Sequence, residues 1–231
     1  MIRDRLRRAR DVLSHRGSAV TCPVCDTSFD AFKPAWNRAG AICWRCGAHE
    51  RHRALWLFLD RERPALLAGT RRMLHFAPEH TLQRRLERRV PEYASADLDP
   101  RKGQLRLDLN DLALPDGAFD AILCSHVLEH IPDDRRAMRE LRRVLDPQGW
   151  CIVMVPIDLG RDTTYEDPSI TDPAERERHF WQHDHVRVYA RDVEDRLRAS
   201  GFAVEAWEPP ADWREPYGLL QADLVFLCRK G

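Results

Sequence analysis

Residues 107–157, LDLNDLALPDGAFDAILCSHVLEHIPDDRRAMRELRRVLDPQGWCIVMVPI, decide the fold of this chain. Within them, residues 118–124 are short and almost wholly apolar, which is typical of a buried strand. After Pro132 the apolar residues recur at helical spacing, and residues 146–149, DPQG, end that helix before a second apolar strand at 150–155. Strands this apolar are covered on both faces, as in parallel sheets. The stretch therefore predicts a βαβ unit.

The flanking sequence extends this unit on both sides. Further strands are predicted at residues 73–76, 93–96, 105–107, 202–207 and 224–228, and further helices at 54–67, 81–89 and 188–200. Seven strands with interleaved helices predict an α/β fold with a doubly wound, Rossmann-like sheet.

Length and charge limit the classes of protein to consider. A chain of 231 residues suits one α/β domain with a small accessory module. Lys+Arg and Asp+Glu balance at 37 each, so no overall basic field makes nucleic acid the default partner. The sequence contains no apolar run long enough for a membrane span, and its basic start lacks the apolar centre of a signal peptide. We expect a cytoplasmic protein without membrane insertion.

Three regions are predicted along the chain. Residues 1–20 place Ile2, Leu6, Ala9 and Leu13 on one stripe among arginines, which predicts a basic amphipathic helix. Packing on the main domain is the favoured role for this helix, and contact with nucleic acid or membrane is the alternative. Residues 21–53 hold the paired cysteines, and residues 54–231 form the main domain.

The paired cysteines have the spacing of a metal site. Cys22 with Cys25 and Cys43 with Cys46 form two CxxC motifs separated by seventeen residues. Four thiolates at this spacing can close a tetrahedron around a structural Zn²⁺ ion, with no position left for substrate. Paired redox thiols are the alternative interpretation.

These motifs carry a resemblance. The order of an acid-plus-leucine turn, an FD-apolar strand, an LEH segment and a helix ending RVL-P-G resembles class I S-adenosylmethionine (SAM)-dependent methyltransferases of the type 11 kind. The pattern CPVC, CWRCG and ERHR resembles a zinc-ribbon head found on bacterial methyltransferase-like proteins. The resemblance implies methyl transfer from SAM, most simply to a small-molecule acceptor. An RNA methyltransferase and a non-catalytic zinc-ribbon binding protein are the alternatives.

The first cofactor contacts are expected after the first strand. Such sheets bind their ligand at the carboxyl ends of the strands, commonly on a glycine-rich turn. Here residues 75–80 read HFAPEH, without glycine. The cofactor contacts predicted in this turn are Phe76, Ala77 and Glu79.

Two acidic positions match the methyltransferase pattern better than the glycine-free turn does. Asp97, about twenty residues beyond the first strand, is expected to accept the ribose hydroxyls, with Asp99 as the competing candidate. Asp108 matches the acid that meets the adenine amino group, and Leu109 is expected to cover the ring.

The segment HVLEH at residues 126–130 has a second possible interpretation. HxxEH on a helix is also the inverted zinc-protease signature. Because the segment follows a strand in methyltransferase-like register and no third ligand is evident nearby, we expect no metal here. Ser125 is a predicted cofactor contact, and His126 is expected to face the methyl group as a catalytic residue. Glu129 and His130 either fix the loop or take part in catalysis.

Residues 165–189 are rich in histidine and aromatic side chains and follow the strand ending at Val155, so they are expected to form a lid or acceptor wall. The catalytic candidates are His183, Asp184 and His185. The acceptor-binding candidates are Tyr165, Trp181, Arg187 and Tyr189. As an alternative, Asp184 and Arg187 only pin the loop to the last helix. A second metal site lacks a clean ligand spacing.

Overall fold

The computed structural model describes residues 9–35 and 38–231. Its strands are β1 (Arg16–Cys22), β2 (Thr27–Phe29), β3 (Lys33–Ala35), β4 (Arg38–Ile42), β5 (Arg72–Phe76), β6 (Glu92–Asp97), β7 (Leu105–Arg106), β8 (Phe119–Ser125), β9 (Leu145–Met154), β10 (Tyr165–Glu166), β11 (Arg187–Val188), β12 (Phe202–Trp207) and β13 (Val225–Lys230). Its helices are α2 (Glu50–Leu57), the π-helical η1 (Phe58–Glu62), α3 (Pro64–Ala68), α4 (His80–Leu86), the 3-10 turn η2 (Leu128–His130), α5 (Asp134–Val144), α6 (Pro173–Phe180), α7 (Val193–Ala199) and α8 (Ala211–Tyr217).

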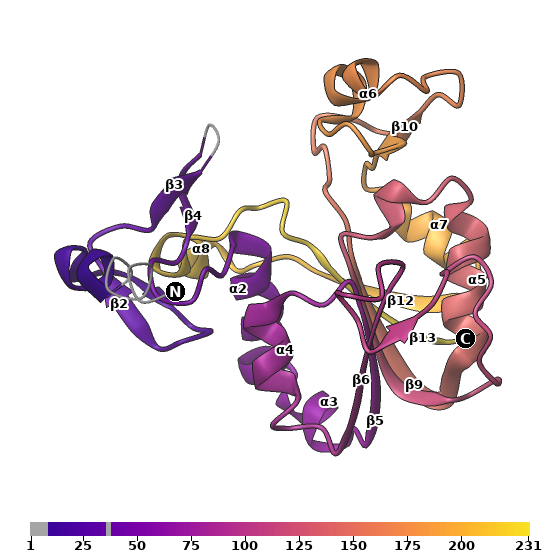
Figure 1. Ribbon diagram of the computed structural model, residues 1–231, viewed down its shortest axis with the longest axis horizontal. Helices are drawn as coiled ribbons and strands as arrows, with labels where there is room; N and C mark the ends of the chain where they lie inside the picture. Colours follow the sequence, from indigo (N-terminus) through magenta and orange to yellow (C-terminus); the bar gives the residue numbers. More distant parts are fainter. Residues whose placement is uncertain (1–8, 36–37) are drawn as a thin grey trace.

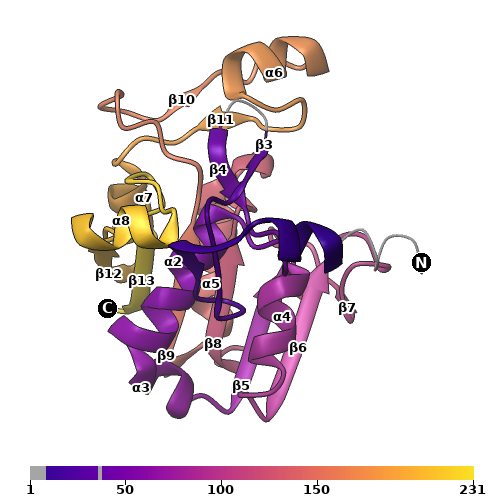
Figure 2. The ribbon, with the colours of Figure 1, turned by 90° about the vertical axis from the view of Figure 1, so that its left-hand side faces the viewer.

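The predicted seven-stranded sheet is confirmed, in the order β12-β13-β9-β8-β5-β6-β7. The five strands from β9 to β7 pair in parallel, and β13 runs antiparallel to both of its neighbours. Helices α2 to α4 cover one face of the sheet, and α5 and α7 cover the other (Figures 1 and 2). The carboxyl ends of β5, β6 and β8 therefore meet at one edge, where such folds bind ligands.

Alternating side chains divide the core between the two faces of the sheet. Met73 and Ile152 pack with the residues of α2, whereas Leu74 and Val153 pack with those of α5. This alternation follows from the two-residue period of a strand, and all four side chains are fully buried. Helix α5 starts at the cap Asp133, whose carboxylate accepts from the Arg136 N–H.

A small cysteine-bearing module precedes the main sheet and consists of the strands β1 to β4 and the helix α2 that follows them. Its strands form two hairpins, β1-β2 and β3-β4. Its buried side chains, such as Val24 and Phe29, belong to the same core cluster as α2 and one face of the sheet. Helix α8, near the C-terminus, packs against β1 beside the module (Figure 1). The two ends of the sequence are therefore joined at this module.

Several predicted helices end or begin elsewhere. The helix expected over 54–67 divides at η1, and α3 restarts at Pro64 because proline lacks the N–H that a continuing helix needs. The helix expected over 188–200 begins only at Val193, because Arg187 and Val188 pair with β10. The strand β9 begins at Leu145, so residues 146–149 lie inside it rather than in a separate turn.

The N-terminal prediction is also corrected. Residues 9–14 are helical, but from Arg16 the chain pairs with β2 instead of continuing the helix to residue 20. Leu13 of the predicted stripe is 70% exposed, whereas Val12 packs against the core. Ile2 and Leu6 lie outside the described residues. Among the described residues, no helix is both long and apolar enough to cross a bilayer.

Candidate cofactor and metal sites

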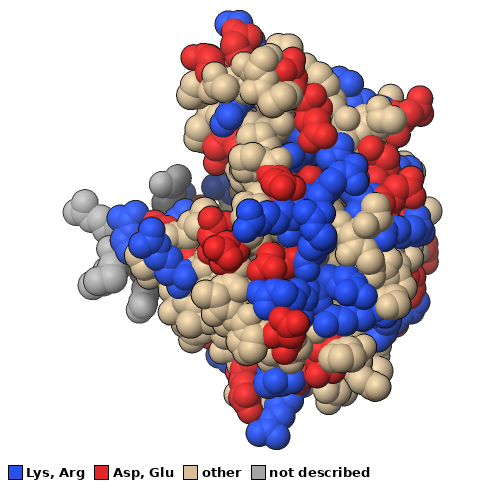
Figure 3. Space-filling model, turned by 90° about the vertical axis from the view of Figure 1, so that its right-hand side faces the viewer, with Lys and Arg blue, Asp and Glu red and all other residues tan. Residues whose placement is uncertain are grey.

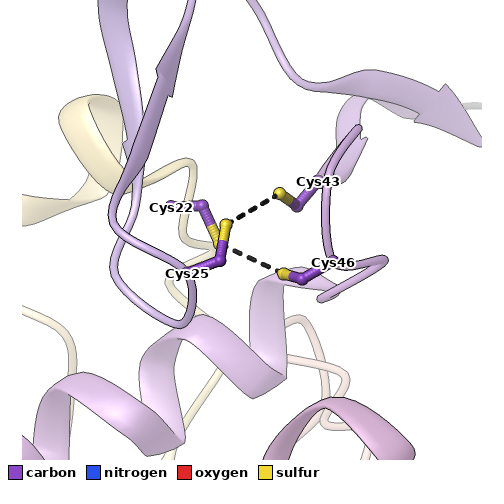
Figure 4. Close-up of side chains that lie close together, drawn as sticks. All are labelled: Cys22, Cys25, Cys43 and Cys46. Atoms are coloured by element: carbon purple, nitrogen blue, oxygen red, sulfur yellow. Dashed lines mark hydrogen bonds between the residues drawn. The ribbon is translucent and has the colours of Figure 1, made fainter. Parts of the chain in front are cut away.

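The four predicted zinc ligands lie together between the β1-β2 and β4-α2 connections (Figure 4). The Cys22 and Cys46 sulfurs are 3.6 Å apart, and the Cys25 and Cys43 sulfurs are 3.7 Å apart. A tetrahedral ion with metal–sulfur bonds of about 2.3 Å has edges of about 3.8 Å, so the spacing fits. The thiols are free and lie well beyond the bonding distance of a disulfide, about 2.0 Å.

Arg53 fixes the loops around these cysteines. Its side chain is fully buried, and it lies over the Phe32 ring at 3.9 Å. All five of its N–H groups donate to main-chain carbonyls, which belong to Gly40, Ala41, Ala48, Tyr217 and Gly218. Burial lowers the pKa of Arg53, against the opposing influence of the nearby thiols. The guanidinium therefore ties the metal-ligand loops to the C-terminal end of α8.

A cavity of about 290 Å³ lies at the carboxyl ends of β5 and β6. Five of the predicted cofactor contacts line it: Phe76, Ala77, Asp97, Asp108 and Leu109. The other lining residues are Ala96, Leu98, Leu107, Asn110, Val127, His130, Ile131 and Pro132. Leu98 is 64% exposed beside Asp97, and sequence analysis missed it as a lining residue. The cavity thus combines two carboxylates with an apolar wall.

The two carboxylates are held by their own turns. Asp97 Oδ1 accepts from the Asp99 N–H at 2.8 Å, and Asp108 Oδ1 accepts from the Asn110 N–H at 2.9 Å. Each aspartate follows or ends a short parallel strand, so the sheet sets their separation. This arrangement can hold two polar groups of one elongated ligand.

The glycine-free loop adopts a glycine-like backbone. Ala77 has a φ of 44°, in the left-handed region where glycine is the usual residue. Its N–H donates to the Ala96 carbonyl at 2.8 Å, which anchors the loop to β6. A non-glycine residue in this region costs roughly 1 to 2 kcal/mol, so the fold tolerates local strain beside the cavity.

Three predicted cofactor contacts, Glu79, Asp99 and Ser125, do not line this cavity. Asp99 is engaged by Arg101 at 2.7 Å on the surface. The Ser125 hydroxyl donates to Glu79 Oε1 at 3.2 Å, so both side chains are used within the protein. These three residues therefore stay predictions as cofactor contacts, and the lining of the cavity favours the other five.

Glu79 joins three parts of the fold. In addition to Ser125, its carboxylate meets His75 Nε2 at 3.2 Å and His52 Nε2 at 3.3 Å. Burial acts to raise the pKa of Glu79, but the contacts with His52 and His75 outweigh it and hold the pKa well below its usual range. The carboxylate therefore links α2 of the module to β5 and β8.

A second, more polar cavity of about 780 Å³ adjoins the first. Its lining residues are Arg38, Arg51, His126, Glu129, His130, Pro156, Trp181, Gln182 and His185. His130 lines both cavities, so it marks their boundary. His126 follows β8 directly and has a φ of 55°, a strained conformation of the kind found at functional sites. The predicted residues His126, Trp181 and His185 are thus brought together.

The histidines of this region have defined partners. His130 Nδ1 lies 3.2 Å from Asp184 Oδ2, and His185 Nδ1 lies 2.9 Å from the Phe180 carbonyl. Asp184 is thus paired with His130. His183 is exposed. Burial lowers the pKa of His185, so its imidazole is neutral near pH 7.

Arg187 and Tyr189 hold the loop in place instead of lining the polar cavity. Arg187 is buried and donates to Glu166 at 2.8 Å and to three carbonyls, those of Leu128, Ile131 and Pro132. Tyr189 is fully buried, and its hydroxyl donates to Asp134 at 2.8 Å. Their predicted contact with the acceptor is corrected, because these bonds occupy them. Arg187 thus holds the loop to η2 and to the turn before α5, whereas the predicted alternative had it pin the loop to the last helix.

Tyr165, the remaining acceptor candidate, also lies apart from the polar cavity. Its hydroxyl meets His179 Nδ1 at 2.8 Å within the α6 segment. Trp181 is 52% exposed and ends α6 in a left-handed conformation with a φ of 73°, on the wall of the polar cavity.

Comparison with known proteins agrees with this geometry. Residues 72–153 match the family described as a methyltransferase domain. A probable S-adenosylmethionine-dependent methyltransferase of Mycobacterium tuberculosis (strain ATCC 25618 / H37Rv) is 37% identical over 68 residues, covering 28% of this chain and 25% of that protein. The chain thus spans about a quarter of the length of that curated relative.

Solved structures share the fold at low sequence identity. The cyclase SpnF is 16% identical, with coverage of 87% of this chain and 86% of that chain and a TM-score of 0.56. A SAM-dependent methyltransferase from Archaeoglobus fulgidus is 13% identical, with coverage of 79% and 95% and a TM-score of 0.53. Residues 72–153 are therefore similar to a methyltransferase domain, and the sheet that contains them has the same fold as the SAM-dependent methyltransferase from Archaeoglobus fulgidus.

Proposed function

We propose that this chain transfers a methyl group from SAM to a small-molecule acceptor that carries an anionic group. The observation that carries the proposal is the position of His130, which lines both the aspartate-bearing cavity and the polar cavity. A donor in the first cavity and an acceptor in the second would meet at this boundary. Proximity and orientation are the main contributions that a protein makes to such a displacement.

The first cavity supplies the groups that a nucleoside needs. Asp97 is assigned to the ribose hydroxyls and Asp108 to the adenine amino group, with Leu109 and Leu98 as apolar contacts for the ring. These assignments follow from the lining of the cavity and from the family resemblance. When bound, SAM supplies a methyl group activated by its sulfonium.

The second cavity favours an anionic acceptor. Arg38 and Arg51 both come from the cysteine module and line it beside His126. The Arg51 Nε is buried and donates no hydrogen bond to any residue that the structure describes, so a ligand oxygen would satisfy it. We assign His126 as the base for an oxygen or nitrogen acceptor because it follows β8 at the cavity wall.

The cysteine cluster is assigned to a structural zinc ion. Four sulfurs at tetrahedral spacing close the coordination shell, so the ion would carry no reaction. Its role would be to position the module, and with it Arg38 and Arg51, over the catalytic domain.

The alternative of RNA as the acceptor gains no specific support from the face over α5 and α7. Figure 3 shows arginines and lysines on the face over α5 and α7, with acidic side chains among them. Arg143 is paired with Glu140 and Asp116, and Arg198 with Glu194 and Asp195. Charges already neutralised in this way release few counterions from a nucleic acid.

A turnover assay tests the proposal. Purified protein, SAM and a panel of small carboxylates and phosphates would be compared with total RNA as acceptors, with S-adenosylhomocysteine measured as the product. We expect formation of this product with an anionic small molecule, and we expect Arg51→Gln to raise KM more than it lowers kcat. Turnover on RNA alone, or turnover unaffected by Arg51→Gln, would contradict the acceptor assignment.

A further inference from the structure

Glu129, His130 and His185 form a cluster with the composition of a metal site. Each offers one ligand atom, and these three atoms all lie within 4.8 Å of one another. Two imidazoles and one carboxylate are a common protein set for Zn²⁺ and related divalent ions. We propose that these residues bind a divalent transition-metal ion, with Zn²⁺ as the reference ion, separately from the four cysteines.

The carboxylate of Glu129 gives independent support. Glu129 is 1% exposed, and neither of its oxygens accepts a hydrogen bond from any residue that the structure describes. His126 Nδ1 lies 3.3 Å from Oε1 but outside hydrogen-bond geometry. A buried carboxylate with this single ion-pair contact and no hydrogen bond is costly unless a cation compensates it. A metal ion would provide that compensation.

Both imidazoles are oriented as metal ligands usually are. His185 Nδ1 faces the Phe180 carbonyl at 2.9 Å, so the proton of the neutral ring is on Nδ1. His130 Nδ1 lies 3.2 Å from Asp184 Oδ2 in an ion-pair contact, which favours the tautomer with its proton on Nδ1. In each ring the Nε2 lone pair is then available to a metal. Such outer partners fix the tautomer and raise the basicity of the ligand nitrogen.

The location of the cluster indicates what the ion would do. Three protein ligands leave an open position, as in catalytic rather than structural zinc sites. All three residues line the polar cavity, and His130 also lines the cofactor cavity. The open position would take an oxygen or nitrogen atom of the acceptor. This role in acceptor binding rests on the proposed function, whereas metal binding does not.

Metal titration tests the site without SAM or turnover. Tag-free protein with its cysteine site loaded would be freed of excess metal and titrated with Zn²⁺ by calorimetry, in parallel with a thermal melt at each zinc concentration. We expect one further equivalent per chain, together with a rise in Tm as zinc is added, because binding to the folded state stabilises it.

Variants at the cluster locate the second equivalent. Glu129→Gln and His185→Gln should each weaken it by more than tenfold. Asp184→Asn should weaken it about 10- to 100-fold by releasing His130. Because Asp184 is half exposed, at 49%, this variant tests the site without disturbing the core. His183→Gln is the matched control and should bind zinc like the wild type.

Three results would each overturn the site. They are the absence of a second equivalent in the wild type at submillimolar zinc, equal binding by wild type and Asp184→Asn, and equal loss in the His183→Gln control. SAM binding measured separately on the same protein distinguishes a failure of this site from a failure of the proposed function.

Discussion

The His52 Nε2 atom lies 3.3 Å from Glu79 Oε1, so helix α2 of the cysteine module contacts the loop between β5 and α4. The His49 N–H donates to His52 Nδ1 at 3.2 Å, which places the His52 proton on Nε2, toward the carboxylate. His52 is buried, and burial lowers its pKa. The contact therefore joins a neutral imidazole to an ionised carboxylate across the two parts of the protein.

Acidification should weaken folding through these histidines. Burial lowers the pKa of His49 to about 4 and also lowers that of His52. The unfolded chain, with histidine pKa values of about 6.5, binds more protons below that pH, so stability falls as pH falls from about 6.5 toward 4. Because His49 is only half-buried, we expect about 1 to 2 kcal/mol of loss between pH 7 and 5.5. Urea unfolding at each pH measures it, with zinc content checked at pH 5.5. If the free energy of unfolding of His52→Gln depended on pH as that of the wild type does, His52 would not be a source of the acid sensitivity.

Replacing Arg53 by lysine should destabilise the protein despite the conserved charge. Lysine has three donors and no planar fork, so at least two of the five carbonyls bound by Arg53 would lose their partner. We expect a loss of about 2 to 5 kcal/mol in the free energy of unfolding, measured by urea denaturation. Arg71→Lys, a substitution at an exposed surface pair, is the control and should change it by less than about 1 kcal/mol. A change in Arg53→Lys as small as in this control would contradict the role of Arg53.

Of the seven cysteines, only the four clustered ones, Cys22, Cys25, Cys43 and Cys46, should determine the zinc content. Elemental analysis of protein dialysed against a weak chelator should give about one zinc per chain. Cys43→Ser should lose this zinc and unfold at lower urea concentration, because structural zinc contributes directly to folding. Cys228→Ala is the control, since Cys228 is buried in the sheet away from the cluster. Unchanged zinc in Cys43→Ser would exclude the site.

Much of the fold was predictable, and the reasons are local. The apolar runs of β8 and β9 and the helical spacing of α5 are fixed by short-range periodicity, and the strand ends place Asp97 and Asp108 at one edge of the sheet. The departures arose where long-range contacts decide. Arg187 was predicted to bind the acceptor, but its side chain donates to main-chain carbonyls in and after η2. Its neighbour Val188 lies in strand β11 rather than in the predicted helix.

We expected no metal at HxxEH because no third ligand is evident near it in the sequence. His185 lies 55 residues beyond His130 in the chain and reaches it only through the fold of the α6 loop. That the buried Glu129 carboxylate accepts no hydrogen bond from the described residues is likewise evident only from the folded structure. Motif spacing could therefore identify the four-cysteine site but not this cluster.

Glycine at position 77, in the loop after β5, should not weaken cofactor binding. Ala77→Gly relieves the positive φ, so cofactor affinity should stay within a few-fold of the wild type. Ala77→Val adds a β-branched side chain to a left-handed position at the cavity wall and should weaken binding by more than tenfold. Calorimetry with S-adenosylhomocysteine compares the three proteins. Equal affinity in Ala77→Val would show that this loop does not shape the cofactor cavity.

The affinity of the purified protein for SAM tests the central claim most directly. Calorimetry should show binding by the wild type and a loss of about 1 to 3 kcal/mol in each of Asp97→Ala and Asp108→Ala, where a hydrogen-bonding partner is removed. Asp99→Ala, whose carboxylate pairs with Arg101 outside the cavity, should bind like the wild type. Absence of binding at millimolar SAM, or equal weakening in Asp99→Ala, would contradict the account.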